Sequence, residues 1–392
     1  MARYITADWL FPVSAPPLRN GVLVLNEAGG IIEYGMREAY PPNELEIYHG
    51  TLVPGFINSH CHLELSFMKG QIAEKTGLLT FVKKVVAIRD NFSHEEQEKA
   101  IHSAADEMLQ NGIVAVGDIS NDNRSFFEKA KGKMRFHTFV EVFDMGPAGT
   151  EQCLSKGQEI YDEIPTVSGS RASITPHAPY SCTPHLISWC DRFSATHGQV
   201  LSIHMQEQKD ENLLFLEKKG VWVDLYASLG ADFNWFTATG KNSLASVLQW
   251  LPEDNHLLFV HNTNTCSEDL STSKTSGKKI FWCFCPNANL YIEDRLPDFE
   301  LFRGETCVIG TDSLASNHKL SVLDEMKTIQ HHSDISFETL LRWATLNGAE
   351  ALHFEDELGS FETGKNPGVN LISGMNMRDM KLTKLSAVRK LA

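Results

Sequence analysis

The sequence predicts an α/β protein: a distorted (β/α)8 TIM barrel with a small flanking β-sandwich. Three observations support this fold class. Apolar strand-like runs alternate with helix-like segments, the 392-residue chain is long enough for one large barrel and a smaller domain, and both ends of the chain carry short strands separated by turns. The runner-up is an open doubly wound sheet. It lacks support because no Gly-x-Gly-x-x-Gly follows a strand to anchor a dinucleotide.

The two ends of the chain are predicted to build the sandwich together. Short apolar runs between turn residues indicate strands in both ends, and the C-terminal strands would complete the sheet begun by the N-terminal ones. We therefore predict a β-sandwich domain from residues 1–52 and 359–392 and a catalytic barrel domain from residues 53–358. The sandwich strands are expected at residues 3–5, 21–25, 31–34, 369–372 and 381–388.

Eight apolar runs are the predicted barrel strands, and right-handed crossovers between them would place the helices in an outer ring. The strands are expected at residues 54–62, 113–118, 136–143, 172–176, 200–204, 257–261, 280–285 and 307–311. The helices are expected at residues 78–89, 95–110, 124–131, 150–164, 184–197, 243–250, 322–331 and 336–352.

Charge and cysteine usage limit the function classes. The chain has 50 acidic and 35 basic residues, a net charge of -15, so it lacks the basic surface that nucleic acid would need. No run approaches the length of a membrane helix and the start has no signal-peptide pattern. The eight cysteines are scattered, which favours reduced thiols, and Cys283 and Cys285 lack zinc-site spacing. We predict a cytoplasmic protein that acts on a small molecule and has no nucleic acid or membrane partner.

Histidines gather where predicted strands end. In a parallel barrel the catalytic groups lie at the C-terminal ends of the strands, and five of the 16 histidines fall there with one aspartate. A single such histidine is more often a core or capping residue, but together these residues predict one site. They are His60 and His62 at the end of the first strand, His177 after the fourth, His204 at the end of the fifth, His261 at the end of the sixth and Asp312 after the eighth.

The residue types predict a hydrolytic metal centre. Neutral imidazoles of His60, His62 and His204 with the carboxylate of Asp312 suit one divalent metal, with Zn²⁺ preferred and Fe²⁺ as the alternative. Such a metal lowers the pKa of a bound water to about 7. Glu207, three residues after His204, could carry a proton to the leaving group, although an acid at a helix start is the plainer interpretation. We expect His261 and Asp312 to orient and deprotonate the water.

Five motifs in this order resemble the amidohydrolase superfamily. They are Val-Pro-Gly-Phe-Ile-Asn-Ser-His-Cys-His-Leu-Glu, Pro-His-Ala-Pro-Tyr-Ser-Cys, Ile-His-Met-Gln-Glu, Val-His-Asn and Ile-Gly-Thr-Asp-Ser. More narrowly they resemble its aminohydrolase branch, which contains cytosine and guanine deaminases, chlorohydrolases, and S-adenosylhomocysteine, methylthioadenosine and aminodeoxyfutalosine deaminases.

The resemblance implies roles for single residues. It implies one metal on His60, His62, His204 and Asp312, proton transfer through Glu207, and an orienting role for His261. It also implies that His177 contacts the substrate ring and that the chain can form a homodimer. Binuclear members use a carboxylated lysine at the end of the fourth strand, and residues 171–180 contain no lysine. That absence favours a deaminase or dechlorinase over a cyclic-amide hydrolase.

Two further residues are predicted to bind substrate. Glu64 could hold a substrate hydroxyl or support His62 from behind, and Arg89 could reach a polar substrate group or be a solvated helix charge. The function predicted is a metal-dependent hydrolytic deaminase that removes an exocyclic amine from a nucleoside or nucleobase-like ring and releases ammonia. The alternatives are a chlorohydrolase, a cyclic amide hydrolase and a non-catalytic barrel scaffold. The loops that select the substrate show no periodic pattern.

Overall fold

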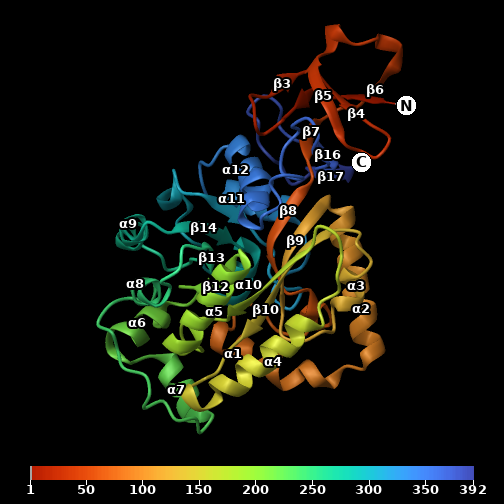
Figure 1. Cartoon of the computed structure of the whole chain (residues 1–392). Coiled ribbons are helices and arrows are strands. Elements are labelled where there is room, and N and C mark those ends of the chain that lie inside the picture. The colour runs from red at the N-terminus through yellow and green to blue at the C-terminus, as the bar shows by residue number, and fades with distance from the viewer. Residues whose placement is uncertain (1) are drawn as a thin grey trace.

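The barrel strands form two four-stranded parallel sheets in this computed structural model, which describes residues 2–392 (Figure 1). One sheet has the order β11-β10-β9-β8 and the other β12-β13-β14-β15. All eight strands overlap the predicted ones, and the predicted α/β fold is confirmed. The strands are β8 (Phe56–Cys61), β9 (Ile113–Ser120), β10 (Arg135–Val142), β11 (Arg171–Pro176), β12 (Leu201–Met205), β13 (His256–His261), β14 (Lys279–Phe284) and β15 (Cys307–Ile309).

Backbone hydrogen bonds join the two sheets at both seams. At one seam the His204 N–H donates to the His177 carbonyl over 2.9 Å, next to the ends of β11 and β12. At the other seam the N–H groups of Thr311 and Asp312 donate to the His60 carbonyl over 2.9 and 3.1 Å. Both seams therefore close at the C-terminal ends of the strands, where the sequence predicts the site.

The helices surround the barrel, and most were predicted. They are α1 (Leu78–Ile88), α2 (His94–Gln110), α3 (Phe126–Lys129), α4 (Thr150–Asp162), α5 (Pro184–His197), α8 (Ser243–Val247), α11 (Val322–His331), α12 (Phe337–Ala344) and α13 (Leu346–Ala351). The single helix predicted at 336–352 is wrong because the chain breaks at Thr345, with φ of -133° and ψ of -87°. Four helices were not predicted: α6 (Lys209–Glu217), α7 (Val221–Ser228), α9 (Ser267–Ser276) and α10 (Pro286–Glu293).

Both ends of the chain meet in two small sheets beside the barrel, where Figure 1 marks the two termini close together. Apolar side chains such as Ile5, Leu23 and Val369 fill the space between the sheets. One sheet has the order β5-β4-β1-β6, with β1 (Arg3–Thr6), β4 (Gly21–Leu25), β5 (Ile31–Met36) and β6 (Leu45–Ile47). The other has the order β17-β16-β7-β2-β3, with β2 (Trp9–Leu10), β3 (Leu18–Arg19), β7 (Thr51–Pro54), β16 (Val369–Ser373) and β17 (Ala387–Lys390).

The last predicted strand, at 381–388, is misplaced. Lys381 forms only an isolated bridge with Asn376, because the chain turns back through Met380 with a left-handed φ of 50°. The strand that pairs with β16 begins later, at Ala387. The division of the chain into a sandwich domain and a barrel domain stays a prediction.

The structure also bears on the predictions about membrane helices and cysteines. Among residues 2–392, no helix is both long enough and apolar enough to cross a membrane. All eight cysteines are free thiols, and Cys283 and Cys285 are buried among the core residues.

A substitution at Gly310 tests how closely the chain packs where β15 meets β8. A Cβ at this position would lie 2.8 Å from the His60 Cβ, 2.9 Å from the His60 carbonyl oxygen and 3.0 Å from the Cys285 sulfur. We expect Gly310→Ala to lower the free energy of unfolding by about 1–3 kcal/mol, because packed backbone must move. Urea unfolding checks this. In the control Gly35→Ala, the new methyl group meets only the movable tip of Tyr40, so an equal loss there would contradict the prediction.

Candidate metal centre

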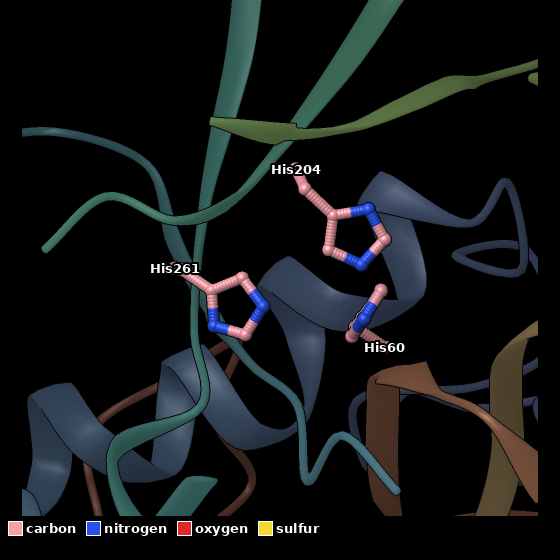
Figure 2. A group of neighbouring side chains, drawn as sticks. All are labelled: His60, His204 and His261. Atoms are coloured by element: carbon pink, nitrogen blue, oxygen red, sulfur yellow. The ribbon is translucent and has the colours of Figure 1, made fainter. Parts of the chain in front are cut away.

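The predicted metal ligands come together at the mouth of the barrel. His60 lies on β8, His62 directly follows that strand, His204 lies on β12, and Asp312 comes three residues after β15. Figure 2 shows the rings of His60, His204 and His261 converging on one spot. One nitrogen from each of these three rings lies within 4.8 Å of the other two, and the same limit holds for a second group made by His60, His62 and Asp312.

The donor atoms face one another closely. His62 Nε2 lies 3.3 Å from His204 Nε2, and Asp312 Oδ1 lies 3.5 Å from His62 Nε2 and 3.8 Å from His60 Nε2. Both ring nitrogens of His60 are buried and have no hydrogen-bond partner among residues 2–392. Buried polar atoms are rarely left without a partner, so the orphaned ring nitrogens of His60 fit a metal-binding role for this residue.

Burial also keeps the histidines neutral. Desolvation lowers the pKa of His62 and of His204 to about 3, and it lowers the pKa of His60 well below its ordinary value. Neutral imidazoles present lone pairs and do not form ion pairs with Asp312. Three imidazole nitrogens and one carboxylate oxygen are a donor set that fits one divalent metal with an open coordination position.

Residues behind the ligands orient them. His204 Nδ1 donates to the His177 carbonyl over 2.9 Å and lies 3.4 Å from Glu141 Oε1, so His204 Nε2 faces the other ligands. The Ser316 hydroxyl donates to Asp312 Oδ2 over 2.6 Å, which leaves Oδ1 for the cluster. Contacts of this kind fix the ring orientation and basicity of metal ligands. Sequence reasoning missed Glu141 and Ser316, although Glu141 lies near the end of a correctly predicted strand.

Glu207 and His261 form a pair beside the ligands. Glu207 Oε1 lies 3.6 Å from His261 Nε2, and His261 Nδ1 donates to Asn289 Oδ1 over 2.9 Å. With Nδ1 bonded to Asn289, Nε2 is the ring nitrogen of His261 that faces Glu207. Burial raises the pKa of Glu207 to about 7, so its carboxyl group can hold or release a proton near neutral pH. Asn289, on α10, was not predicted as a functional residue.

The backbone is strained at His261 and at Asp312. His261 has a φ of 75° and Asp312 a φ of 56°, both in the left-handed region that most side chains avoid. Strained residues of this kind cluster at functional sites because the surrounding structure holds them in place. The strain here redirects the chain at the end of β13 and just after β15.

The three predicted substrate contacts differ in position. His177 lies beside the ligands, with its ring centre 4.9 Å from that of His204 and its Nδ1 2.7 Å from the Ser181 hydroxyl. Glu64 is buried, and its Oε2 accepts the Asn121 N–H over 2.9 Å. Arg89 lies at the end of α1, 3.4 Å from Asp122, outside the cluster. Of the three predicted substrate contacts, only His177 therefore lies beside the predicted metal ligands.

Comparison with known proteins decides the family. The model of the amidohydrolase family matches residues 51–391, nearly the whole chain.

This chain belongs to the amidohydrolase family.

Relatives and solved structures agree with this amidohydrolase assignment. A 5-methylthioadenosine/S-adenosylhomocysteine deaminase of Symbiobacterium thermophilum is 25% identical over 374 residues, which are 90% of this chain and 80% of the relative. The structure of Helicobacter pylori aminofutalosine deaminase with methylthio-coformycin has a TM-score of 0.81 at 24% identity and covers 97% of this chain and 94% of that chain. A Xanthomonas campestris adenosine deaminase with bound zinc has a TM-score of 0.76 at 19% identity, covering 98% of this chain and 89% of its own.

These findings confirm three predictions about the amidohydrolase. The predicted family and its aminohydrolase branch are confirmed, and so is an enzyme that hydrolyses carbon–nitrogen bonds other than peptide bonds. The donor cluster makes the chain a candidate metalloprotein. The identity of the metal and the roles of single residues are proposals that follow below.

Metal binding can be measured directly on this amidohydrolase. We expect one divalent ion per chain, and we expect chelation to lower the unfolding temperature and Zn²⁺ to restore it. A metal present at 100 times its Kd adds about 2.7 kcal/mol of stability. Elemental analysis of His204→Ala should show that the ion is lost. The control His353→Ala removes a histidine that pairs with His256 outside the cluster, and this variant should keep the ion. Equal metal content in the two variants would contradict the assignment.

Because the carboxyl group of Glu207 is buried, we expect the free energy of unfolding to depend on pH. Its pKa is about 7 in the folded chain and near 4.5 when unfolded, so folding binds a proton between these values and stability is lost as pH rises through 7. In chelated protein, Glu207→Gln should gain roughly 3 kcal/mol over wild type between pH 4.5 and pH 8, at 1.36 kcal/mol per pKa unit. The control Glu217→Gln alters an exposed carboxyl and should show no such trend. A pH-independent difference for Glu207→Gln would refute the prediction.

Proposed function

We propose that this amidohydrolase is a metal-dependent hydrolytic deaminase that removes an exocyclic amine from a nucleoside-type ring and releases ammonia. The observation that carries the proposal is the Glu207–His261 pair next to four convergent metal donors. Relatives named for deaminating methylthioadenosine, S-adenosylhomocysteine and adenosine confirm the predicted reaction class. The substrate within that class is not assigned.

The proposed metal is Zn²⁺, held by His60, His62, His204 and Asp312. A divalent ion bound there lowers the pKa of a water to about 7 and so supplies the nucleophile at neutral pH. Fe²⁺ suits the same imidazole and carboxylate donors, and the zinc-bearing neighbour favours Zn²⁺.

The chain's own residues handle the protons in this proposal. Glu207 takes a proton from the nucleophile and gives it to the ring nitrogen next to the carbon that carries the amine. Its pKa of about 7 suits both steps, because a proton carrier works best near the operating pH. The free lone pair of His261 Nε2 accepts a hydrogen bond from the nucleophile and orients it, with Asp312 on the opposite side. The hydroxyl proton of the tetrahedral carbon then passes to the amine, the bond between carbon and the amine nitrogen breaks, and ammonia leaves while the ring carbon keeps a carbonyl oxygen.

Three side chains are proposed to hold the substrate. His177, beside the ligands, contacts the ring that is deaminated. Glu64 keeps one buried carboxylate oxygen, Oε1, without a partner among the described residues, and this oxygen is free for a substrate hydroxyl. Arg89 would act at the outer edge of the site, where its side chain is 29% exposed. We also propose that the enzyme works in the cytoplasm, without a nucleic acid or membrane partner, and that it can form a homodimer.

Ammonia release tests the proposed function. We expect a panel of adenosine-type nucleosides to include substrates that release ammonia, and we expect a chelator to abolish that release. Glu207→Gln should lower kcat by about 10²–10⁴-fold, because it removes a general acid–base group. Glu217→Gln serves as the surface control.

The products separate the alternatives. Chloride or a ring-opened acid in place of ammonia would indicate the chlorohydrolase or cyclic amide hydrolase reaction. Absence of a bound ion and of stabilisation by Zn²⁺ would indicate the non-catalytic scaffold. Full activity in Glu207→Gln would rule out the proton-carrying role.

A further inference from the structure

Gln206 immediately precedes Glu207 and adopts an uncommon backbone conformation. The residue is fully buried and its φ is 50°, in the left-handed region. Side chains other than glycine keep this conformation only where their surroundings hold it. The contacts of Gln206 therefore determine where the chain leaves β12 and where Glu207 points.

The side chain of Gln206 makes three buried hydrogen bonds to distant segments. Its Oε1 accepts from the Thr265 hydroxyl over 2.6 Å. Its Nε2 donates to Asn212 Oδ1 over 3.2 Å and to Asp269 Oδ2 over 3.1 Å. Asn212 belongs to α6, Asp269 belongs to α9, and Thr265 lies in the loop after β13. One side chain thus connects the end of β12 to three other parts of the barrel rim.

The backbone of the same turn also forms hydrogen bonds to other segments. Glu211 Oε1 accepts the Gln206 N–H over 3.0 Å, and the Asn264 N–H donates to the Gln206 carbonyl over 2.9 Å. Asn264 Nδ2 donates to the carbonyls of Gln206 and Glu207, both over 3.1 Å. The turn that carries Glu207 is therefore bonded to the loop that follows His261.

We propose that Gln206 is a positioning residue that holds Glu207 against His261. This inference rests on the proposed function, in which Glu207 carries the proton. Asn264 and Thr265 lie only three and four positions after His261, so bonds to Gln206 fix the two strand ends relative to each other. They set the 3.6 Å separation of Glu207 Oε1 and His261 Nε2. A group that transfers protons must be placed closely, since a misplacement of about 1 Å can cost about 10²-fold in rate.

The test replaces the hydrogen-bonding groups and keeps the length of the side chain. We expect Gln206→Met to lower kcat by about 10²-fold with little change in KM, since the carboxyl of Glu207 is displaced and the binding surface is not. Metal content should stay at the wild-type value. The solvent deuterium isotope effect on kcat should increase, because proton transfer becomes slower. Thr265→Val removes one bond to Gln206 and should show the same changes to a smaller degree, which keeps the test available if Gln206→Met folds poorly.

A matched control separates positioning from general stability. Asn242 lies on the outer side of the same network, where its Nδ2 donates to Asp269 Oδ1 over 2.5 Å and its Oδ1 accepts the Ala245 N–H over 2.9 Å. Asn242→Ala should lower the unfolding temperature and leave kcat and the isotope effect near wild type. The proposal is overturned if Gln206→Met keeps the wild-type kcat and isotope effect, or if Asn242→Ala changes both as strongly.

Failure of the proposed function gives a different result. In that case the wild-type enzyme releases no ammonia from any nucleoside tested, and the crystal structure of Gln206→Met decides the positioning role. A longer distance between Glu207 Oε1 and His261 Nε2 in the variant supports the role. An unchanged distance overturns it.

Discussion

Buried lone pairs that face one another are the constraint on which this structure depends. His62 Nε2 and His204 Nε2 lie 3.3 Å apart, burial keeps both rings uncharged, and His60 has no hydrogen-bond partner for either ring nitrogen. Buried polar atoms are rarely left without a partner, and one cation among these donors would satisfy them together. The surrounding contacts hold the donors in this arrangement.

Barrel closure is what produces this arrangement. His60 comes from the first barrel strand and Asp312 follows the last, and the hydrogen bonds from Thr311 and Asp312 to the His60 carbonyl join them. His204 is placed by the second seam, through its bonds to the His177 carbonyl. Ligands distant in the sequence are thus neighbours because the two half-barrels close there. The left-handed turns at His261 and Asp312, and the bonds of Gln206, fix the backbone beside these donors.

There is a physical reason why the sequence predicted the barrel strands and singled out residues that converge at the barrel mouth. Strands covered on both faces appear as continuous apolar runs, and a rule about strand ends selects His60, His62, His204 and Asp312. Helix α9 was missed because its sequence is mostly polar and Leu270 is its only buried apolar residue, which leaves no amphipathic period.

Other parts of the site depend on packing that no local pattern reveals. Asn289 contacts His261 and Gln206 contacts Thr265 from positions that are distant in the sequence, and the direction of the Arg89 side chain at the end of α1 cannot be known from its sequence. Glu141 is different, since applying the strand-end rule to carboxylates as well as histidines would have found it.

Locating the metal tests the account most directly. A crystal structure with anomalous scattering measured on both sides of the zinc edge should show one strong peak per chain, within bonding distance of His60, His62, His204 and Asp312. The expected distances are about 2.0–2.2 Å for nitrogen and oxygen ligands of zinc. A chain without a peak, or a peak held by Glu141, His177 and His204 in its place, would contradict the central claim that these four donors form the metal centre.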